Sequence, residues 1–598
     1  MQASFVSTPA RFVQTALRHA DAPAYFVREA GGWQPTTWAT HADQVDMAAR
    51  ALLALGVNPG DAVCVLGFNR PEWVIMDMAA MMIGAVPAGI YWTSPPQEVE
   101  HILRHSRSPV LLVDTDERGQ MALSLRDQLP NLKHIIGMKG VAGQGAELLS
   151  WDAFMAMGES RLQTMVEYRL HGLKPQDPGT FIYTSGTTGP SKAVVLSHAN
   201  LAWSAQALRQ SLRATAQDRV ISYLPLAHVA EQMISIHGPT VGAYPIYFAR
   251  SLDELSEHLK EVRPTVFFGV PRVWEKMHAG IQAKLAGATG VKGKLARWAL
   301  RVGSQWHESV LDGRVPGRWL SWQMKWAGKL VHRKVKEAIG LDQAHMLSSG
   351  AAPIAADKLR FMTGLDLVIR EVYGMSETCG ATSLSIDGAT RLGSVGRPLP
   401  GVEMRIADDG EILMRGPHIF QGYAGSEQAT AQAVQDGWLH SGDLGHLDAD
   451  GYLFITGRKK DLLITSGGKN ISPANIETDL MTLPLVEHAV VCGDGRHYLS
   501  ALLTLDQEAL SALATKQALS GQGLHRHPLV LAELQAGVDL VNGRQARVAQ
   551  VRKFSVLPAN LSIQAGELTP TLKVKRQAVI TRYQDVVEQM YAEAPPSR

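Results

Sequence analysis

The stretch Tyr183-Thr-Ser-Gly-Thr-Thr-Gly-Pro-Ser-Lys192 decides the fold class. It begins at the end of an apolar run, Phe181 to Tyr183, that is typical of a β-strand. Glycines let a backbone approach an anion and aim its N–H groups at it, hydroxyls add donors, and Lys192 adds a positive charge. Five Ser or Thr residues and two glycines within ten positions exceed what a surface turn requires. We therefore interpret the stretch as a phosphate-binding loop that follows a strand.

The loop differs from the P-loop of kinases and motor proteins. That motif requires G-x-x-x-x-G-K-[ST]. Here Gly186 and Gly189 are three positions apart, and Lys192 is followed by Ala193. The sequence therefore predicts a phosphate loop of another type.

Helical and strand-like patterns alternate on both sides of the loop. Before it, helical spacing over Asp43 to Leu55 precedes strand patterns at Ala62 to Leu66 and Val110 to Val113. After it, strand patterns occur at Val220 to Leu224 and Val266 to Val270. This alternation predicts parallel sheets covered by helices.

The apolar stretch from Trp73 to Ile90 is the best candidate for a membrane span. Asp77 interrupts it and Pro87 breaks it, so its uninterrupted part is too short for the ~20 residues that a span requires. We expect a buried helix instead, with Pro71 near its first turn.

Residues 391–457 have short strand patterns and frequent turns. Asp408-Asp409-Gly410 separates two such runs, and Asp448-Ala-Asp-Gly451 precedes another. These hairpin signals predict a small β-barrel or sheet.

A new mixed pattern begins after Arg458, with a helix from Pro473 and a strand at His488 to Val491. We therefore expect two domains, residues 1–457 and residues 458–598. The predicted fold is α/β: a large N-terminal domain of two helix-covered sheets plus a small β-barrel, joined by a hinge to a smaller α+β C-terminal domain.

The second chemical block is Glu371-Val-Tyr-Gly-Met-Ser-Glu377-Thr378. A carboxylate beside hydroxyls is suited to Mg²⁺, which prefers one or two carboxylates together with substrate phosphates. The block is not the G-x-S-x-G elbow of serine hydrolases, because Thr378 replaces the second glycine. A hydrolase is therefore the weaker interpretation.

The third block is Gly437-Trp-Leu-His-Ser-Gly-Asp443, followed by Gly457-Arg-Lys-Lys-Asp461. Asp443 is suited to accept hydrogen bonds from ribose hydroxyls, as acidic residues do in other nucleotide sites. His440, Asp443 and His446 also have a spacing that a metal ion would tolerate. The hairpin turns around them make the metal site the weaker interpretation.

The bulk composition is that of an ordinary globular protein, with 45% hydrophobic and 19% charged residues and a formal net charge of +2. Nothing in this balance indicates nucleic acid as a partner. Cys64, Cys379 and Cys492 lack C-x-x-C spacing, which argues against a disulfide scaffold or a cysteine metal site. Residues 1–14 lack the basic and apolar regions of a secretory signal, so we expect a cytoplasmic protein. No pattern defines an oligomeric state.

Residues 291–336 have an unusual composition. They contain eleven Lys or Arg residues, interleaved with Trp298, Trp306, Trp319, Trp322 and Trp326. A basic helix with aromatic residues is suited to the surface of an anionic membrane. The alternative is a solvated helical pair with its tryptophans in the core. The sequence leaves both open, and a peripheral membrane contact through 291–336 is one expected partner.

The three blocks, in this order and at these separations, resemble the AMP-forming adenylating superfamily, which includes acyl-CoA synthetases, firefly-type luciferases and peptide-synthetase adenylation domains. The resemblance extends over nearly the whole chain. Tyr223-Leu-Pro-Leu-Ala-His228 and Ser349-Gly-Ala-Ala-Pro353 are similar to further blocks, one facing the acyl pocket and one flanking adenine. Pro271-Arg-Val-Trp-Glu-Lys276, the long insert after it and Gly566-Glu-Leu-Thr-Pro-Thr-Leu-Lys573 look like long-chain acyl-CoA synthetases.

The resemblance implies a ligase that uses ATP, Mg²⁺ and coenzyme A. A fatty acid would be converted to acyl-AMP with release of pyrophosphate, and its acyl group would then pass to CoA. One alternative is a related adenylating enzyme with a carrier-protein thiol or O₂ as acceptor. A nucleotide-binding membrane protein without activity is a third reading, which the candidate residues for both steps oppose.

The resemblance also implies residue roles. Lys573 would be the mobile catalytic lysine of the first step, and His228 would face the acyl pocket. The implied catalytic set is Lys573, Thr184, Glu377 and Lys192, of which Thr184 and Glu377 would hold Mg²⁺. Phosphate contacts are expected from Thr184, Ser185, Gly186, Thr187, Thr188, Gly189 and Lys192. Nucleoside contacts are expected from Gly350, Ala351, Ala352, Glu371, Val372, Tyr373, Gly374, Met375, Ser376, Asp443 and Arg458.

The C-terminal domain carries the remaining implied roles. Lys460 would be the hinge, and a turn that includes Gly467, Gly468 and Lys469 would approach CoA. Many members of the superfamily have a lysine at the position of Ile464. Because this chain lacks it, we assign no second catalytic lysine there.

Overall fold

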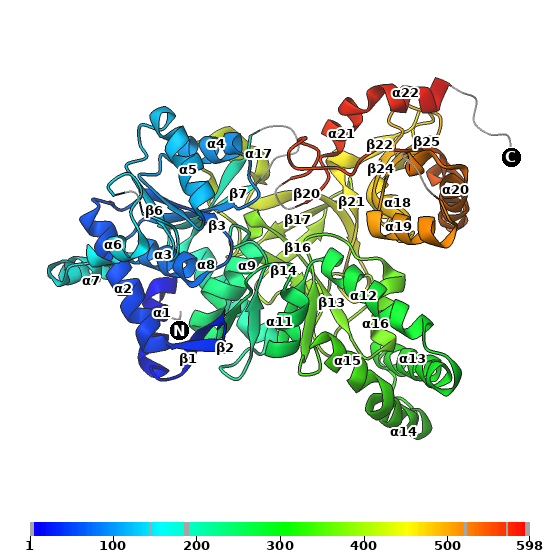
Figure 1. Cartoon of the computed structure of the whole chain (residues 1–598), viewed down its shortest axis with the longest axis horizontal. Coiled ribbons are helices and arrows are strands. Elements are labelled where there is room, and N and C mark those ends of the chain that lie inside the picture. Colours follow the sequence, from blue (N-terminus) through cyan, green and yellow to red (C-terminus); the bar gives the residue numbers. More distant parts are fainter. Residues whose placement is uncertain (1–4, 144, 185–189, 520–522, 570–571, 593–598) are drawn as a thin grey trace.

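A seven-stranded sheet lies in the N-terminal half of the chain (Figure 1). The computed structural model describes residues 5–143, 145–184, 190–519, 523–569 and 572–592. The strand order is β18 (Gly422–Tyr423), β8 (Lys192–Ser197), β7 (Pro178–Thr184), β4 (Val86–Tyr91), β3 (Ala62–Gly67), β5 (Val110–Val113) and β6 (His134–Gly137). The strands from β7 to β6 are parallel, whereas β8 and β18 are antiparallel additions. The parallel sheet predicted around the phosphate loop is confirmed.

The prediction of a single helix over Trp73 to Ile90 is wrong. Helix α3 (Pro71–Met82) ends before Gly84, whose φ of 77° is left-handed, and strand β4 follows. Helix α3 is buried from Glu72 to Met82, and β4 is buried along its whole length. Hydrophobicity alone cannot separate a buried helix from a buried strand, because neither has a polar face.

Two further sheets complete the helix-covered part. One has the order β11 (Val266–Gly269), β12 (Met346–Ser349), β13 (Ile369–Met375), β14 (Gly380–Leu384) and β15 (Arg397–Pro398). The other has the order β2 (Gly32–Thr37), β1 (Pro23–Glu29), β10 (Ile246–Phe248) and β9 (Val220–Ser222). Since β11, β12 and β13 are parallel, their carboxyl ends meet at one edge, where ligands bind in such sheets.

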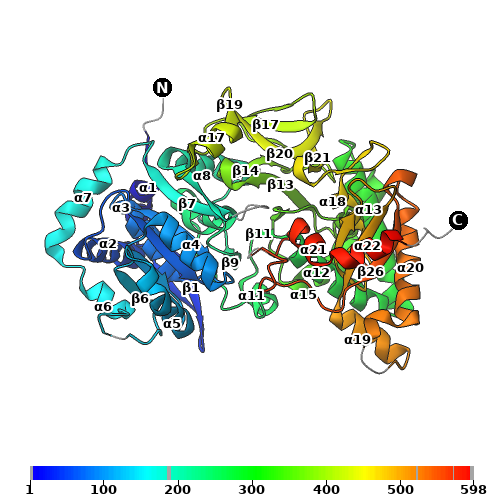
Figure 2. The same cartoon turned by 90° about the horizontal axis from the view of Figure 1, so that it is seen from above.

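The predicted hairpins form a small antiparallel sheet. Its strands are β16 (Glu403–Ile406), β17 (Glu411–Arg415), β20 (Trp438–Leu447), β19 (Val434–Gln435) and β21 (Leu453–Arg458). Figure 2 shows it above the junction between the two helix-covered parts. It therefore places the third chemical block next to the second.

The segment after Arg458 has its own core. Strands β24 (Val486–Cys492), β25 (Leu499–Leu505) and β26 (Val551–Val556) pack with α18 (Pro473–Leu480) and α20 (Pro528–Asn542). An ion pair from Glu487 reaches Arg272 on α12 (Pro271–Ala286) of the N-terminal part. The two parts are therefore in direct contact in this structure.

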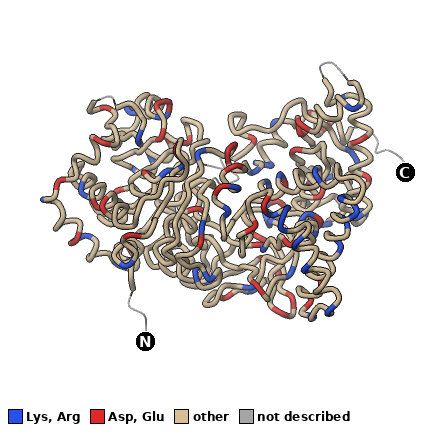
Figure 3. The backbone as a smooth tube through the Cα atoms, turned by 60° about the horizontal axis from the view of Figure 1, so that its bottom comes forward, with Lys and Arg blue, Asp and Glu red and all other residues tan. Residues whose placement is uncertain are grey.

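Three further features bear on function. All three cysteines are free and buried, and burial raises the pKa of Cys64 to about 11. Helices α13 (Gly290–Leu311) and α14 (Arg318–Ala327) form a hairpin at the lower right of Figure 1. Figure 3 shows Lys and Arg interspersed with Asp and Glu along the tube. Among the described residues, no helix has the length and apolarity needed to cross a bilayer.

Candidate active site

The phosphate loop connects two neighbouring antiparallel strands. Thr184 is the last residue of β7 and Lys192 the first of β8, and the two are direct cross-strand partners. The expected residues Ser185, Gly186, Thr187, Thr188 and Gly189 lie outside the described part of the chain. The strands nevertheless fix where the loop leaves the sheet.

Glu377 is brought to this hairpin by a tyrosine that the motifs did not reveal. The hydroxyl of Tyr423 donates to Oε1 of Glu377 at 2.7 Å, and Nζ of Lys192 lies 5.1 Å from the centre of the Tyr423 ring. Tyr423 reaches both because β18 pairs with β8. Burial, together with the Glu377 carboxylate, raises the pKa of Tyr423, so the phenol keeps its proton and acts as a donor.

The chemistry of Glu377 fits a bound cation. Its side chain is 8% exposed, and no Lys, Arg or His of the described residues forms an ion pair with it. Buried charges are normally paired or coordinate a metal. One carboxylate oxygen is held by Tyr423, so the other is available to a hard cation such as Mg²⁺.

We expect Tyr423→Phe to weaken this cation site without disturbing the fold. The substitution keeps the ring and removes only the hydroxyl that orients Glu377. The Mg²⁺ concentration for half-maximal adenylate formation should rise about 10-fold, because a hydrogen bond to a charged group contributes ~1.5–3 kcal/mol. Titrating Mg²⁺ in a pyrophosphate-release assay measures this. An unchanged midpoint would exclude Tyr423 from orienting the ligand.

Residues 350–352 follow the end of β12 and lie beside β13. Gly350 follows β12, and a Cβ built on it would lie 3.0 Å from the carbonyl oxygen of Val372 and 3.2 Å from the ring of Phe268. Ala351 has a left-handed φ of 70°. Ala352 is exposed beside it. The backbone at Gly350 therefore lies close against Val372 of β13 and Phe268, and a side chain at this position would crowd both.

Glu371, the first residue of the second block, has its carboxylate engaged by a backbone group of the protein. Its Oε2 accepts a hydrogen bond from the Gly393 N–H at 3.1 Å, and burial raises its pKa to about 7. The rest of the block, Val372, Tyr373, Gly374, Met375 and Ser376, belongs to β13 or the turn after it.

Asp443 is the meeting point of the second and third blocks. Its Oδ2 accepts from the Tyr373 hydroxyl at 2.8 Å, and its Oδ1 accepts from Nε of Arg458 at 2.9 Å. Asp443 and Arg458 are cross-strand partners in β20 and β21. Asp443 is 5% exposed, so it is held in one position. A carboxylate fixed in this way can accept from vicinal hydroxyls.

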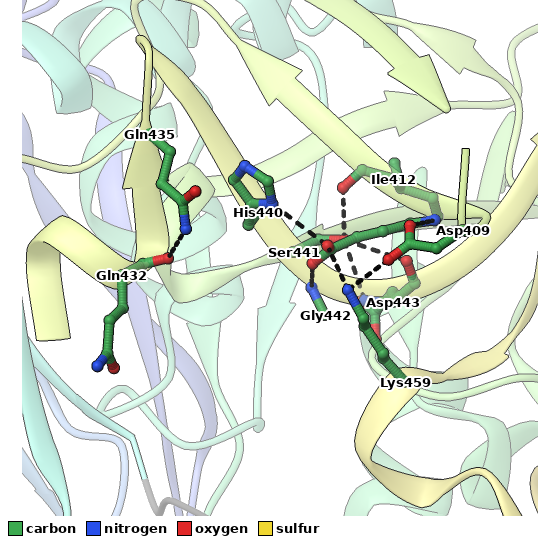
Figure 4. A network of polar contacts seen from close by, with 10 residues as sticks. Asp409, Ile412, Gln432, Gln435, His440, Ser441, Gly442, Asp443 and Lys459 are labelled. Carbon is green, nitrogen blue, oxygen red and sulfur yellow. Dashed lines mark hydrogen bonds and ion pairs between the residues drawn. The ribbon is translucent and has the colours of Figure 1, made fainter. Parts of the chain in front are cut away.

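Glu411 is a second residue that the motifs did not reveal. Its carboxylate accepts from the Gly442 N–H at 2.8 Å and contacts Lys459 at 3.1 Å and His440 at 3.2 Å. Figure 4 shows how these three partners lie around the turn that carries Asp443. Burial alone would raise its pKa, but these contacts hold the pKa below its usual value. Glu411 therefore ties the turn that carries Asp443 to the start of the proposed hinge.

The three residues considered for a metal site each contact other groups of the protein. His440 contacts Glu411, Asp443 is bound by Tyr373 and Arg458, and the His446 ring stacks on Phe454 at 5.1 Å. Their contacts are those of a protein network rather than of a metal centre.

Lys573 of the C-terminal part lies at the same site. Its charge is close enough to lower the pKa of His228, which burial and Lys573 together bring to about 4. Lys573 has solvent-accessible surface, but desolvation by the surrounding protein atoms lowers its pKa to about 8. Arg458 lowers it further and Asp443 opposes the shift. Lys573 therefore lies within electrostatic range of His228, Arg458 and Asp443.

His228 is neutral and held in one tautomer. It caps α9 (Val229–Gln232), where the Ala230 N–H donates to its Nδ1 at 3.2 Å. The proton therefore resides on Nε2. The structure brings this residue together with Lys573, Asp443 and Arg458 across about 350 residues of sequence.

Four predicted residues lie elsewhere in this conformation. Lys460 is exposed in the short helix Lys459–Asp461. Gly467, Gly468 and Lys469 form an exposed turn between β22 (Leu463–Ile464) and β23 (Asn470–Ile471). The turn is held by its own domain, since Ser466 Oγ contacts Nδ1 of His497 at 2.7 Å.

The chain matches two domain families that meet near this site. Residues 12–424 match the AMP-binding enzyme family, and residues 460–595 match the C-terminal domain of AMP-binding enzymes. Among curated proteins, it is 36% identical to long-chain-fatty-acid–CoA ligase ACSBG2 of Gallus gallus, covering 98% of this chain and 81% of that protein. It is 38% identical to long-chain-fatty-acid–CoA ligase FadD15 of Mycobacterium bovis, covering 96% of this chain and 95% of that protein.

Solved structures share the fold. The o-succinylbenzoate CoA synthetase of Bacillus subtilis, in complex with its acyl-adenylate intermediate, has a TM-score of 0.69 at 21% identity over 96% of this chain and 98% of that one. The adenylation domain of a carboxylate reductase from Mycobacterium chelonae has a TM-score of 0.74 at 20% identity, over 99% and 92% of the two chains. The two domain matches cover most of the chain, and the curated relatives are similar to it over nearly its whole length. The chain therefore belongs to the AMP-binding enzyme family.

Proposed function

We propose that the chain is an ATP-dependent, AMP-forming ligase that joins a long-chain fatty acid to coenzyme A. The observation that carries this is the position of Lys573, a C-terminal residue that lies with His228, Asp443 and Arg458 of the nucleotide site. The relatives named long-chain-fatty-acid–CoA ligases support the substrate class.

In the first step, a carboxylate oxygen attacks the α-phosphorus of ATP, and the bond to the β-phosphate oxygen breaks. Negative charge develops on the phosphoryl oxygens, where the Lys573 ammonium would stabilise it. Lys192 would bind the leaving phosphates. Thr184 and Glu377 would hold Mg²⁺, which supplies further charge neutralisation when bound.

In the second step, the thiol sulfur of CoA attacks the acyl carbon, and the bond to the phosphate oxygen breaks. AMP leaves, and the thiol proton passes to solvent. Lys573 is not required here. We propose that residues 458–598 then rotate about Lys460 relative to residues 1–457. Gly467, Gly468 and Lys469 would then take the place of Lys573 near the acyl group.

The nucleoside would bind across β12, β13 and β20. Adenine would stack on Tyr373, with Gly350, Ala351 and Ala352 on its other side. The ribose hydroxyls would donate to Asp443, next to Arg458. We further propose that the protein acts in the cytoplasm, where it meets its fatty acid. A contact with a membrane surface through residues 291–336 is proposed on separate observations, which are given below.

We expect turnover to increase from short to long fatty acids. Each methylene that the pocket buries adds about 0.8 kcal/mol of binding, or roughly fourfold in affinity. A panel from acetate to oleate, with ATP and CoA and scored by pyrophosphate release, tests the proposal. A preference for acetate or for an aromatic acid would contradict the substrate class.

The acceptor is tested separately. With the preferred acid, AMP release should depend on added CoA. Equal AMP release with a carrier-protein thiol in place of CoA would favour the alternative acceptor while keeping the adenylating step.

A further inference from the structure

Helix α14 presents a row of aromatic side chains to solvent. Trp319, Trp322 and Trp326 are 69%, 52% and 41% exposed. The first two rings stack with centroids 4.9 Å apart, and the third lies edge-on to Trp322 at 6.2 Å. Residues three and four positions apart are neighbours on a helix, so the three indoles form one continuous face. Globular proteins rarely leave such a face uncovered without a partner.

The opposite side of α14 is already occupied. Ala327 is fully buried and, with Leu320 and Met324, packs against Ala299 and Val302 of α13. The tryptophans on α13 are also largely covered: Trp298 packs in the same cluster. The hairpin therefore has a core of its own, and the exposed row is a second, separate apolar face.

Cations border the row on the side away from α13. Arg318 and Lys325 lie four residues before and three residues after Trp322, so they flank it on the helix. Nζ of Lys329 lies 5.7 Å from the centre of the Trp326 ring. All three side chains are exposed, and no carboxylate of the described residues pairs with them.

The hairpin carries far more positive charge than the chain as a whole. Residues 291–336 contain eleven Lys or Arg residues and only two acidic ones, Glu308 and Asp312, although the whole chain has a formal charge of only +2. An apolar row of indoles edged by unpaired cations matches the boundary of an anionic bilayer, where indoles occupy the headgroup level and cations contact phosphates.

We propose that α14 docks on an anionic lipid bilayer through Trp319, Trp322 and Trp326, with Arg318, Lys325 and Lys329 on the headgroups. This partner deepens the proposed function, because long-chain fatty acids partition into bilayers and a docked ligase would take its acid from there. In Figure 1, α14 lies at the lower edge of the molecule, away from the nucleotide residues of β20, so docking would leave that site open.

The full-length protein should co-sediment with vesicles of phosphatidylcholine and phosphatidylglycerol in equal parts. Binding to vesicles of phosphatidylcholine alone should be at least about 10-fold weaker, and high salt should release the protein, because salt screens the headgroup attraction. ATP and CoA are omitted, so the result does not depend on ligase activity.

Two variants assign the binding to the row. Trp319→Ala/Trp322→Ala/Trp326→Ala and Arg318→Glu/Lys325→Glu/Lys329→Glu should each lose about 10-fold or more in binding to the anionic vesicles. Tyr168→Ala is the matched control, since Tyr168 is 75% exposed on α7 (Gln163–Gly172), at the opposite end of Figure 1. It should bind like the parent protein.

Turnover of a short, water-soluble acid should be the same in all four proteins, which shows that they are folded. Failure of the parent protein to bind anionic vesicles overturns the docking proposal while leaving the ligase proposal intact. So does equal binding to both vesicle types, or unchanged binding by the tryptophan variant. A concentration-dependent dimer that the tryptophan variant abolishes, without vesicle binding, would assign the face to a second copy instead.

Discussion

Lys573→Ala should lose on the order of a hundredfold or more in acyl-adenylate formation, comparable to removing one transition-state donor. The ammonium is a compact charge that can contact the carboxylate and the α-phosphate together. The same variant, given synthetic acyl-AMP and CoA, should still form thioester at a substantial rate. Pyrophosphate release measures the rate of adenylate formation, and thioester formation from acyl-AMP measures the rate of the second step. Both are measured on one preparation.

Lys575→Ala is the matched control, since Lys575 lies two residues along the same segment. It should leave both steps near the parent rates. If Lys573→Ala slows both steps equally, or neither, then domain alternation is wrong even for a chain that proves to be a ligase.

The pH dependence of kcat/KM should also report on Lys573. Desolvation and the nearby Arg458 lower the pKa of Lys573 to about 8, from a usual value of 10.5. The ammonium is therefore present below that pH and is lost above it. Because kcat/KM reports the free enzyme, kcat/KM for ATP should fall as pH rises through about 8, and this limb should be absent in Lys573→Ala.

Lys460→Pro should have the opposite effect. Proline fixes φ near −65° and would restrict the rotation of the hinge. Lys460 lies in the first turn of the short helix Lys459–Asp461, where a missing N–H is tolerated, so the orientation seen here should persist. Adenylate should form at close to the parent rate, while thioester formation should slow by ~10-fold or more, as expected when a closing motion limits turnover.

Lys460→Ala removes the side chain but leaves φ free, and it should behave like the parent. Single-turnover experiments that follow acyl-AMP and acyl-CoA in one sample separate the two steps. Equal rates of thioester formation in Lys460→Pro and Lys460→Ala would contradict the assignment of the hinge to Lys460.

The sequence predicted those parts of the molecule that depend on local pattern. The strand before the phosphate loop and the hairpin at Asp408-Asp409-Gly410 follow from residue type and turn chemistry, and both are confirmed. The helix expected over Trp73 to Ile90 is wrong after Met82, because a run without a polar face has no period to interpret.

The candidate site was predictable only as separate blocks. Tyr423 acts on Glu377 from 46 residues away, and Glu411 on Gly442 from 31, so neither carries a local signal. Their roles come from strand pairing, which places β18 beside β8 and β17 beside β20. The aromatic row of α14 was ambiguous for a similar reason, since only packing against α13 decides which tryptophans remain exposed.

The buried cysteines have a consequence for an enzyme that handles a mixed anhydride. Acyl-AMP is an electrophile that any nearby thiolate would capture, which would leave the protein acylated and inactive. Cys64, Cys379 and Cys492 are 0%, 0% and 3% exposed, and burial raises the pKa of each thiol. Because only the thiolate is the nucleophile, none of them competes with the incoming substrate thiol. The chain is thereby protected from self-modification during the interval between its two half-reactions.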